Sequence, residues 1–360
     1  MPKRKNPDVV SGKSPFLPAR PISLKILGDY LDLSPATISL VLNNAPGVRS
    51  IPQETRDRVT AAAKKFDYRP SFYARSLRRR QSFSIGVLVP ELSDGYSVLV
   101  MNGIEEVLME EGYFYLTASH RRKADLIEEY PRLLMDRSVE GFIAIDTALQ
   151  HPLPLPVVAV AGHKKIEGVT NLLLDHRRAA ELALRHLYQL GHRHVAFMRG
   201  QTFSSDSGDR WKSFMAVAKE LGLEVQPELV IQLQQNLSSP ELGYPVVHQL
   251  LAAKKPFTAL VSFNDVAAIG AIRAFRDHNL RVPEDVSVMG FDDIQVAAYH
   301  NPSLTTIRQP LNSMGITSAR VLLERLRGKK DYPEEIPITP ELIIRESTIP
   351  PNPKRMTHRS

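Results

Sequence analysis

The 360-residue chain contains no cysteine. This absence excludes disulfide bonds, thiol catalysis and cysteine metal sites, and it suits a reducing cytoplasm, where we expect the protein to work. No apolar run approaches the roughly 18 residues that a membrane-spanning helix needs, so no membrane association is expected. The basic N-terminus is not followed by an apolar core, which argues against a secretory signal.

Motifs of the common α/β enzymes are also missing. The first predicted strand is not followed by G-x-G-x-x-G, and neither a G-x-x-x-x-G-K-[ST] loop nor a nucleophile elbow occurs. His163, His176 and His192 lack the spacing of metal ligands and read as surface or loop histidines. We therefore expect no enzymatic activity, no cofactor and no bound metal.

Charge is distributed unevenly along the chain. Residues 1–82 hold 16 Lys and Arg against 6 Asp and Glu, whereas residues 83–360 hold 30 against 33. A basic segment joined to a slightly acidic body indicates an anionic polymer as the partner of the basic part. A solvated basic tail would explain the charges before residue 20, but not the excess that continues to Arg80.

The pattern from Ser23 to Asn43 predicts two short helices joined by a turn. Ser23 and Ser34 are candidate N-caps, and Pro35 suits the first position of the second helix, where its missing N–H is harmless. That second helix carries small residues at its start and would fit a DNA major groove. An ordinary helical hairpin in a larger core is the alternative interpretation.

A third helix is expected over about residues 52–66, which completes a small three-helix bundle. The next segment, YRPSFYARSLRRRQS, is strongly basic and too short to form a stable helix alone. It is either a flexible linker or a segment that folds on DNA, where Leu77 would enter the minor groove as an apolar wedge.

From Phe83 onward short apolar runs alternate with amphipathic helices, which predicts an α/β fold with parallel sheets. The length favours two similar subdomains. Ligands of open sheets bind beyond the carboxyl ends of the strands. Polar pairs follow several of the predicted strands and are candidate ligand-binding residues: Ser93 and Asp94, Asp146 and Thr147, Asn264 and Asp265, and Asp292 and Asp293.

These segments resemble the lactose-repressor (LacI/GalR) family of transcription regulators from Ile22 to about Thr348. The resemblance is carried by the order and spacing of SPATISLVLNN, PQETRDRV, YRPSFYARSL, IGVLVPEL, NGIEEVLMEEGY, LGHRHVAFMRG, FNDVAAIGAIRAF, VMGFDDIQVA and NPSLTTIRQP. It implies an all-α helix-turn-helix headpiece, a hinge helix and a periplasmic-binding-protein-like α/β core with two parallel-sheet subdomains. It also implies a homodimer that binds a pseudo-palindromic double-stranded DNA operator and responds to a small-molecule effector.

The resemblance assigns roles in the DNA-binding part. Base-reading positions fall on Pro35, Ala36, Ser39 and Leu40, and phosphate contacts on Ser34, Thr37 and Asn43. Where the family usually has Arg, this chain has Leu40, so we expect an operator that departs from the usual half-site. The hinge contacts to DNA fall on Tyr73, Ala74 and Leu77.

In the core, the resemblance places the effector between the subdomains. The first loop, around Asp94, lacks one of the family's aromatic residues at Ser97, which makes an effector other than a simple hexose plausible. Asn264 and Asp265 have the alternative role of capping the helix that starts there. The expected effector-binding residues are Ser93, Asp94, Tyr96, Asp146, Arg210, Asn264, Asp265 and Asp292.

The expected domains are a disordered tail (1–20), the headpiece (21–68), the hinge (69–82), the core (83–348) and a disordered C-terminal tail (349–360). Within the core, the N-subdomain takes about 83–178 and 310–332, and the C-subdomain about 179–309 and 333–348.

A periplasmic sugar-binding protein would share the core but would need an export signal and no basic headpiece. An architectural DNA binder would not need a two-lobed core. The C-terminus has no leucine heptads, so a tetramer through a coiled coil is not expected.

Overall fold

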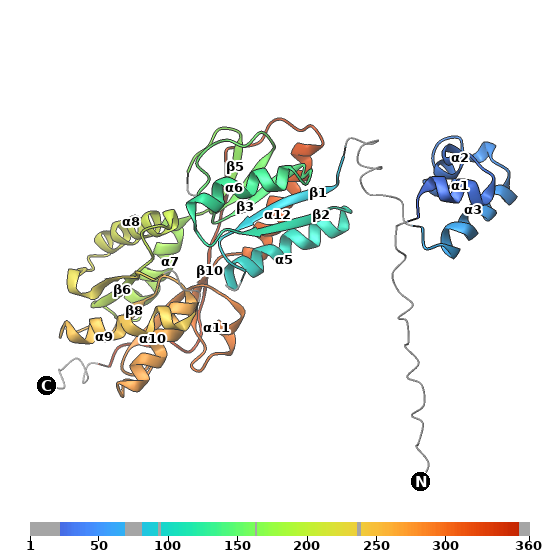
Figure 1. The fold of residues 1–360 in the computed structure, drawn as a ribbon. Helices are drawn as coiled ribbons and strands as arrows, with labels where there is room; N and C mark the ends of the chain where they lie inside the picture. The colour runs from blue at the N-terminus through green and yellow to red at the C-terminus, as the bar shows by residue number, and fades with distance from the viewer. Residues whose placement is uncertain (1–21, 69–80, 93–94, 163, 236–238, 353–360) are drawn as a thin grey trace, which may run out of the picture. The chain divides into compact units, whose positions relative to one another are not determined.

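The computed structural model describes residues 22–68, 81–92, 95–162, 164–235 and 239–352. The chain divides into two units, residues 1–80 and 81–360, which are described separately (Figure 1). The expected N-terminal tail and most of the expected hinge lie outside the described residues.

The described part of the first unit, residues 22–68, contains three α-helices and a short 3-10 helix: α1 (Leu24–Leu31), α2 (Pro35–Leu42), η1 (Val48–Ser50) and α3 (Gln53–Lys65). Both predicted caps are confirmed. The Ser23 hydroxyl accepts a hydrogen bond from the Ile26 N–H, and the Ser34 hydroxyl accepts one from the Thr37 N–H. Each cap satisfies one of the N–H groups that a helix start leaves unpaired.

A small apolar core holds the three helices together. Leu27, Ile38 and Val59, one from each helix, are completely buried and pack in one cluster. Burying a side chain of this size contributes roughly 1.5–3 kcal/mol, so a bundle with so few of them has a modest core. The helix-turn-helix prediction for this segment agrees with the structure.

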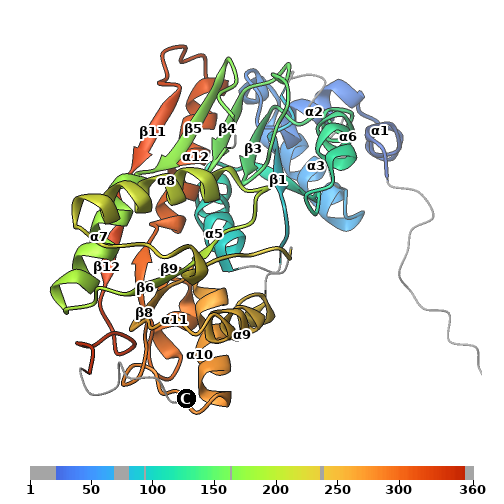
Figure 2. The same ribbon diagram turned by 90° about the vertical axis from the view of Figure 1, so that its left-hand side faces the viewer.

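The second unit contains two six-stranded sheets (Figures 1 and 2). The first has the order β11-β5-β4-β3-β1-β2, and all its strand pairs are parallel. Its strands are β1 (Ser84–Val89), β2 (Phe114–Ser119), β3 (Gly141–Ile145), β4 (Val157–Val160), β5 (Val169–Leu174) and β11 (Glu335–Ile338). This sheet forms the N-lobe.

The second sheet has the order β12-β10-β9-β8-β6-β7 and is parallel except for the β10–β12 pair. Its strands are β6 (Val195–Arg199), β7 (Val230–Gln232), β8 (Ala259–Val261), β9 (Ser287–Asp292), β10 (Thr305–Arg308) and β12 (Glu341–Ile343). This sheet forms the C-lobe, so the predicted fold of two parallel-sheet subdomains is confirmed.

Helices cover both faces of each sheet, which explains why the interior strands β1, β3, β4, β8 and β9 are buried along their whole length. In the N-lobe, α5 (Gly95–Glu110) and α12 (Leu311–Leu326) cover one face and α6 (Ala124–Met135) the other. In the C-lobe, α7 (His176–Gln189) and α8 (Ser205–Glu220) cover one face, and α9 (Tyr244–Ala252) and α10 (Asp265–Asp277) the other. A short α11 (Gln295–Tyr299) follows β9.

The chain passes between the lobes three times: after β5, after β10 and after β11. The third crossing corrects the expected boundary, because residues 335–338 pair with β5 in the N-lobe, whereas 333–348 was expected in the C-lobe. The strand β11 adds an edge to the N-lobe sheet before β12 returns to the C-lobe. These strands have only three or four residues each, too few for a periodic pattern to reveal.

The C-terminal segment is ordered further than expected. The Nε2–H of His192 donates to the Ile349 carbonyl at 2.9 Å, and the Ile349 N–H donates to the Ser287 hydroxyl. The other ring nitrogen of His192 bonds the Thr258 hydroxyl at 2.8 Å, and burial lowers the pKa of His192 to about 4. The expected tail from 349 therefore starts too early, because a buried neutral histidine fastens Ile349 to the C-lobe.

Candidate functional site

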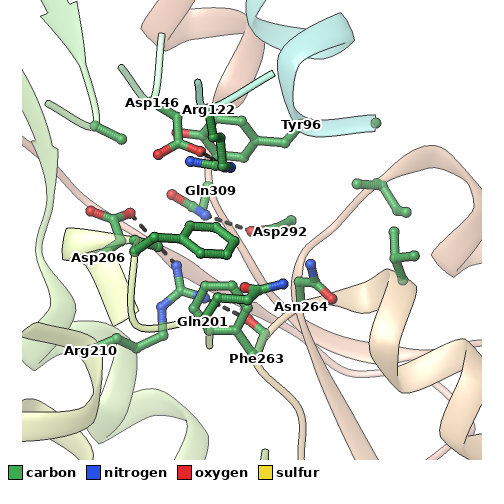
Figure 3. Close-up of a pocket in the computed structure, with 16 residues that line it drawn as sticks. Tyr96, Arg122, Asp146, Gln201, Asp206, Arg210, Phe263, Asn264, Asp292 and Gln309 are labelled. Atoms are coloured by element: carbon green, nitrogen blue, oxygen red, sulfur yellow. Dashed lines mark hydrogen bonds and ion pairs between the residues drawn. The ribbon is translucent and has the colours of Figure 1, made fainter. Parts of the chain in front are cut away.

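A cavity of about 100 Å³ lies between the two lobes. Its walls are formed largely by residues that follow the carboxyl ends of β1, β3, β6, β8, β9 and β10, which is where ligands of open α/β sheets bind. Figure 3 shows Tyr96, Arg122 and Asp146 on one side of the cavity and Asp206, Arg210 and Phe263 on the other. The lining therefore combines side chains from both lobes.

Arg210 on α8 is a buried residue of this cavity that several groups contact. It is 5% exposed, its guanidinium carbon lies 3.6 Å from the Phe291 ring centroid and 4.5 Å from that of Phe263, and Nη1 donates to the Phe263 carbonyl at 2.5 Å. Burial lowers the pKa of Arg210, while the nearby carboxylates of Asp292 and Asp206 act against this shift. The two rings and the carbonyl hold the planar cation in one orientation.

Three carboxylates surround this arginine, each with a different partner. Asp146 is bonded by Nη2 of Arg122, and Asp292 accepts a hydrogen bond from Nε2 of Gln309 at 2.6 Å. Asp206 lies 3.8 Å from Nη2 of Arg210. The cavity is thus lined by three aspartates and two arginines. This excess of negative charge disfavours an anionic ligand.

Several polar atoms in the cavity walls are buried without a partner in the described structure. They are Oη of Tyr96, Nε of Arg210 and Oε1 of Gln309. Burial raises the pKa of Tyr96 well above its usual value, and the carboxylates of Asp206, Asp146 and Asp292 add to this shift. The phenol therefore stays protonated and able to donate. Buried polar groups are nearly always hydrogen-bonded, so these atoms indicate a place for a polar ligand.

Aromatic rings complete the cavity. Phe203 and Phe263 both belong to the C-lobe, and the guanidinium carbon of Arg122 lies 4.9 Å from the Phe203 ring centroid. Ser97, where the sequence lacks an aromatic residue, is completely buried and does not line the cavity. The aromatic surface that Ser97 does not provide in the N-lobe is thus supplied by Phe203 and Phe263 of the C-lobe.

Five of the expected effector-binding residues do line this cavity, namely Tyr96, Asp146, Arg210, Asn264 and Asp292. Asn264 fulfils both proposed roles, because its Oδ1 also accepts a hydrogen bond from the Ala267 N–H and so caps α10. Ser93 and Asp94 lie outside the described residues.

The expectation for Asp265 is wrong. This residue is completely buried within the C-lobe and does not line the cavity. Its carboxylate accepts hydrogen bonds from the Thr306 hydroxyl at 2.6 Å and from the Ile294 N–H at 2.9 Å. As the first residue of α10, Asp265 lies about 100° around the helix from its neighbour, which turns its side chain toward β10 instead of the cavity.

Asp265 instead makes the free energy of unfolding of the protein depend on pH. Burial raises its pKa to about 7, whereas hydrogen bonds from Thr306 and Ile294 oppose the shift. Because the folded state binds this proton more tightly than the unfolded state, the stabilisation is present at low pH and is lost as pH rises through 7. We expect the unfolding free energy of the native protein to fall between pH 5 and about 8 relative to that of Asp265→Asn, by as much as ~1.4 kcal/mol per pH unit.

Urea unfolding of the two proteins across this range measures the difference. Asp277→Asn, at an exposed carboxylate on the same helix, is the matched control and should give a constant difference from the native protein. Parallel profiles for native protein and Asp265→Asn would contradict the assignment.

Sequence reasoning missed eleven of the residues that line the cavity, among them Arg122, Gln201, Phe203, Asp206, Phe263 and Gln309. The sequence could have indicated Arg122 and Gln201, because they follow the predicted strands β2 and β6. Several of the expected effector-binding residues were chosen because they follow a predicted strand in the same way. Asp206 lies four residues before Arg210 on α8, which places both on one helix face. Gln309 follows β10, a strand that was not predicted.

The outward face of α2 is the candidate nucleic-acid surface. Pro35 and Ala36 are exposed, and Thr37 and Leu40 are partly exposed. Ser39 corrects the expectation, because it is only 6% exposed and its hydroxyl accepts a hydrogen bond from Nδ2 of Asn43 at 3.2 Å. At about 100° per residue Ser39 lies between Ala36 and Leu42, three residues from each, on the border between the outward face and the apolar face.

The Asn43 amide is turned toward its own helix, donating to the Ser39 carbonyl at 2.8 Å. The hinge residues Tyr73, Ala74 and Leu77 lie outside the described residues.

Within the described ranges no cluster of His, Asp or Glu with the geometry of a metal site occurs. None of the described helices is long and apolar enough to cross a membrane.

The fold and the cavity define the class of protein: a two-lobed ligand-binding core preceded in the chain by a helix-turn-helix unit. Residues 32–71 match the model for bacterial regulatory proteins of the lacI family, and residues 184–348 match a periplasmic binding protein-like domain. The HTH-type transcriptional repressor PurR of Yersinia pestis bv. Antiqua is 30% identical over 334 residues, covering 90% of this chain and 96% of the relative. The chain therefore belongs to the lacI family of DNA-binding transcriptional regulators.

Solved structures agree with this assignment. A lac repressor dimer bound to operator and the anti-inducer ONPF has a TM-score of 0.81 at 24% identity, covering 92% of this chain and all of that one. A lacI-family regulator from Enterococcus faecium with bound ribose has a TM-score of 0.65 at 27% identity, covering 75% of this chain and all of that one. The relatives are transcriptional regulators and not enzymes.

Proposed function

We propose that this protein is a repressor whose affinity for a pseudo-palindromic operator is controlled by an uncharged, polyhydroxylated small molecule bound between the lobes. The observation that carries this proposal is the cavity in which Arg210, three carboxylates and three unpartnered buried polar atoms meet. No catalytic role is assigned to these residues. Because its target is chromosomal DNA, we place the protein in the cytoplasm.

The polar atoms specify the chemistry of the ligand. Nε of Arg210 needs an acceptor, Oε1 of Gln309 needs a donor, and the Tyr96 hydroxyl can do either. A hydroxyl group both donates and accepts, so a polyol satisfies all three. The three carboxylates and two arginines of the cavity can also bond to the hydroxyl groups of such a ligand, and this does not require the ligand to carry a net charge. The related regulator from Enterococcus faecium, with bound ribose, is consistent with a ligand of this class.

Control of operator affinity follows from the position of the cavity. A ligand held by side chains of both lobes stabilises one relative orientation of them, and the lobes are joined by three crossings. A ligand shifts such an equilibrium only by its difference in affinity for the two states, typically ~1–3 kcal/mol. We propose that this shift folds or frays the hinge, which changes how firmly the recognition helices are held on DNA, and that bound repressor blocks polymerase.

We further propose that two copies associate through the exposed apolar side chains on α5 and β2. Met109 is 69% and Phe114 65% exposed, and Val98 is 42% exposed. The strand β2 is an edge strand and therefore offers unpaired backbone groups. Phe114 is in register with Ser84 at the start of β1, so association here would bring the two N-terminal chains together. Helix-turn-helix dimers need that arrangement to reach two half-sites.

The test is a selection of the full-length protein on random duplex DNA, followed by affinity measurements with and without a panel of pentoses, hexoses and polyols. We expect enrichment of a pseudo-palindrome and a change in its affinity of roughly 5- to 150-fold with at least one panel member. A lack of any sequence preference would contradict operator binding. A preference that no panel member alters would contradict the effector class.

Leu40 gives a prediction about operator sequence. An arginine at this outward position can bond the O6 and N7 atoms of guanine, whereas leucine can only contact a thymine methyl group. We expect Leu40→Arg to select guanine at one step of each half-site, with a preference of ~1–3 kcal/mol over the base that the native protein selects. Repeating the selection with this variant measures the shift. Arg49→Leu, at an exposed position outside α2, should leave the selected sequence unchanged.

A further inference from the structure

A second cavity of about 240 Å³ adjoins the first, beside α6. Three residues, Arg122, Asp146 and Phe203, line both cavities and separate them. The remaining walls of the second cavity are formed by His120, Ala124, Ile127, Glu128, Ala148 and Gln150.

The polar groups in these walls already have partners within the protein. His120 bonds the Thr147 hydroxyl through Nε2 at 2.9 Å and accepts from the Arg122 N–H through Nδ1 at 3.1 Å. The Gln150 amide donates to the Ala148 carbonyl at 2.7 Å and accepts from Nζ of Lys164 at 2.6 Å. Glu128 is exposed to solvent. The surface left to a ligand is therefore mainly the side chains of Ala124, Ile127, Ala148 and Phe203.

The two cavities thus differ in what they can bind. The first holds buried polar atoms without partners, and the second holds apolar side chains and polar groups that are already bonded. Phe203 stands between them and is 42% exposed, with Arg122 stacked on its ring. A large aromatic side chain left this exposed at a cavity edge has apolar area that a ligand can bury.

We propose that the effector is a two-part molecule: a polyhydroxylated unit in the first cavity, joined to an apolar substituent, aromatic or aliphatic, in the second. This inference rests on the proposed function, because it extends the same effector site. The substituent passes along Phe203 and packs against Ile127 and Ala148. A ring is compatible with the available space, since a dry apolar cavity of about 150 Å³ accommodates benzene.

The substituent adds affinity through the apolar area that it buries. At roughly 25 cal/mol per Å², burying some 60 Å² of a ring gives about a tenfold gain. A polyhydroxylated unit in the first cavity leaves Ala124, Ile127 and Ala148 uncovered, because these three residues line only the second cavity. The phenyl glycoside of an effective sugar should therefore bind about tenfold tighter, or more, than its methyl glycoside.

The experiment measures dissociation constants of the full-length protein by titration calorimetry. The probes are matched methyl and phenyl glycosides of common pentoses and hexoses. Ala148→Phe fills the second cavity and should reduce the phenyl-to-methyl affinity ratio from about ten to about one. Ala298→Phe, which adds the same ring at an exposed position of α11, is the matched control and should leave the ratio unchanged.

A ratio near one in the native protein, or a high ratio that survives in Ala148→Phe, overturns the two-part effector and leaves the proposed function intact. A panel in which no glycoside binds overturns both the polyol effector and its extension. Should Ala148→Phe fail to fold, Phe203→Leu provides the second test, because it removes the ring against which the substituent packs. That variant should also lower the ratio.

Discussion

Replacement of Arg210 by methionine is expected to weaken effector binding by roughly 30-fold to more than 1,000-fold, because truncating a buried, hydrogen-bonded charge costs ~2–5 kcal/mol. Methionine keeps much of the length that packs between Phe263 and Phe291 but removes every donor. It also removes the buried positive charge that interacts with Asp206 and Asp292. The binding of whichever sugar or polyol the panel identifies, measured by calorimetry, gives the loss directly.

The operator complex provides the second measurement for this variant. Arg210→Met should still bind the selected operator, since the helix-turn-helix unit is unchanged, but the sugar should no longer alter that affinity. Arg273→Met is the matched control, because Arg273 is an exposed residue paired with Asp277 on the surface of α10. A full effector response in Arg210→Met would remove this arginine from the site.

Gly103→Ala is expected to destabilise the core by ~1–3 kcal/mol, the usual cost of overpacking. A Cβ atom on Gly103 of α5 would lie 2.0 Å from the Asn312 carbonyl oxygen and 2.8 Å from the Ile316 nitrogen of α12. The contact is reciprocal, since a Cβ on Gly315 would lie 2.0 Å from the Val100 carbonyl oxygen. The two helices touch through their backbones here, so an added methyl group must push them apart.

Gly208→Ala provides the matched comparison, with the same substitution inside another helix. A Cβ atom on Gly208 of α8 would have no neighbouring atom of the described structure within 4 Å, so alanine there should stabilise the protein by ~0.5–1 kcal/mol through its better helix propensity. Urea unfolding midpoints of the two variants should therefore move in opposite directions. A neutral or stabilising Gly103→Ala would contradict the close approach of α5 and α12.

Local signals were sufficient for most of the fold. The serine caps and Pro35 determine where α1 and α2 begin, because they act within one helical turn. The long apolar strands and amphipathic helices predicted the two parallel sheets, because burial on both faces leaves a continuous hydrophobic run. The strands β10, β11 and β12 were missed because their pairing depends on partners far away in the chain.

The site was predicted only in part, for a related reason. Asn264 and Asp265 are neighbours in the chain, and both carry polar side chains suited to ligand binding. Only Asn264 lines the cavity, whereas the carboxylate of Asp265 accepts a hydrogen bond from Thr306 inside the C-lobe. Ser39 likewise falls on the buried side of its helix. The direction of a side chain depends on how its element packs, which composition and spacing do not specify.

The sequence by itself determined the class of this protein, because helix caps, hydrophobic periodicity and the basic N-terminal segment act over short stretches of chain. Only the tertiary structure decided which side chains meet in the cavity and that a second, apolar cavity adjoins it. Arg122 and Phe203 are 81 residues apart in the chain and belong to different lobes, yet their side chains stack. Contacts of this kind form only when the two lobes fold together, so no local pattern encodes them.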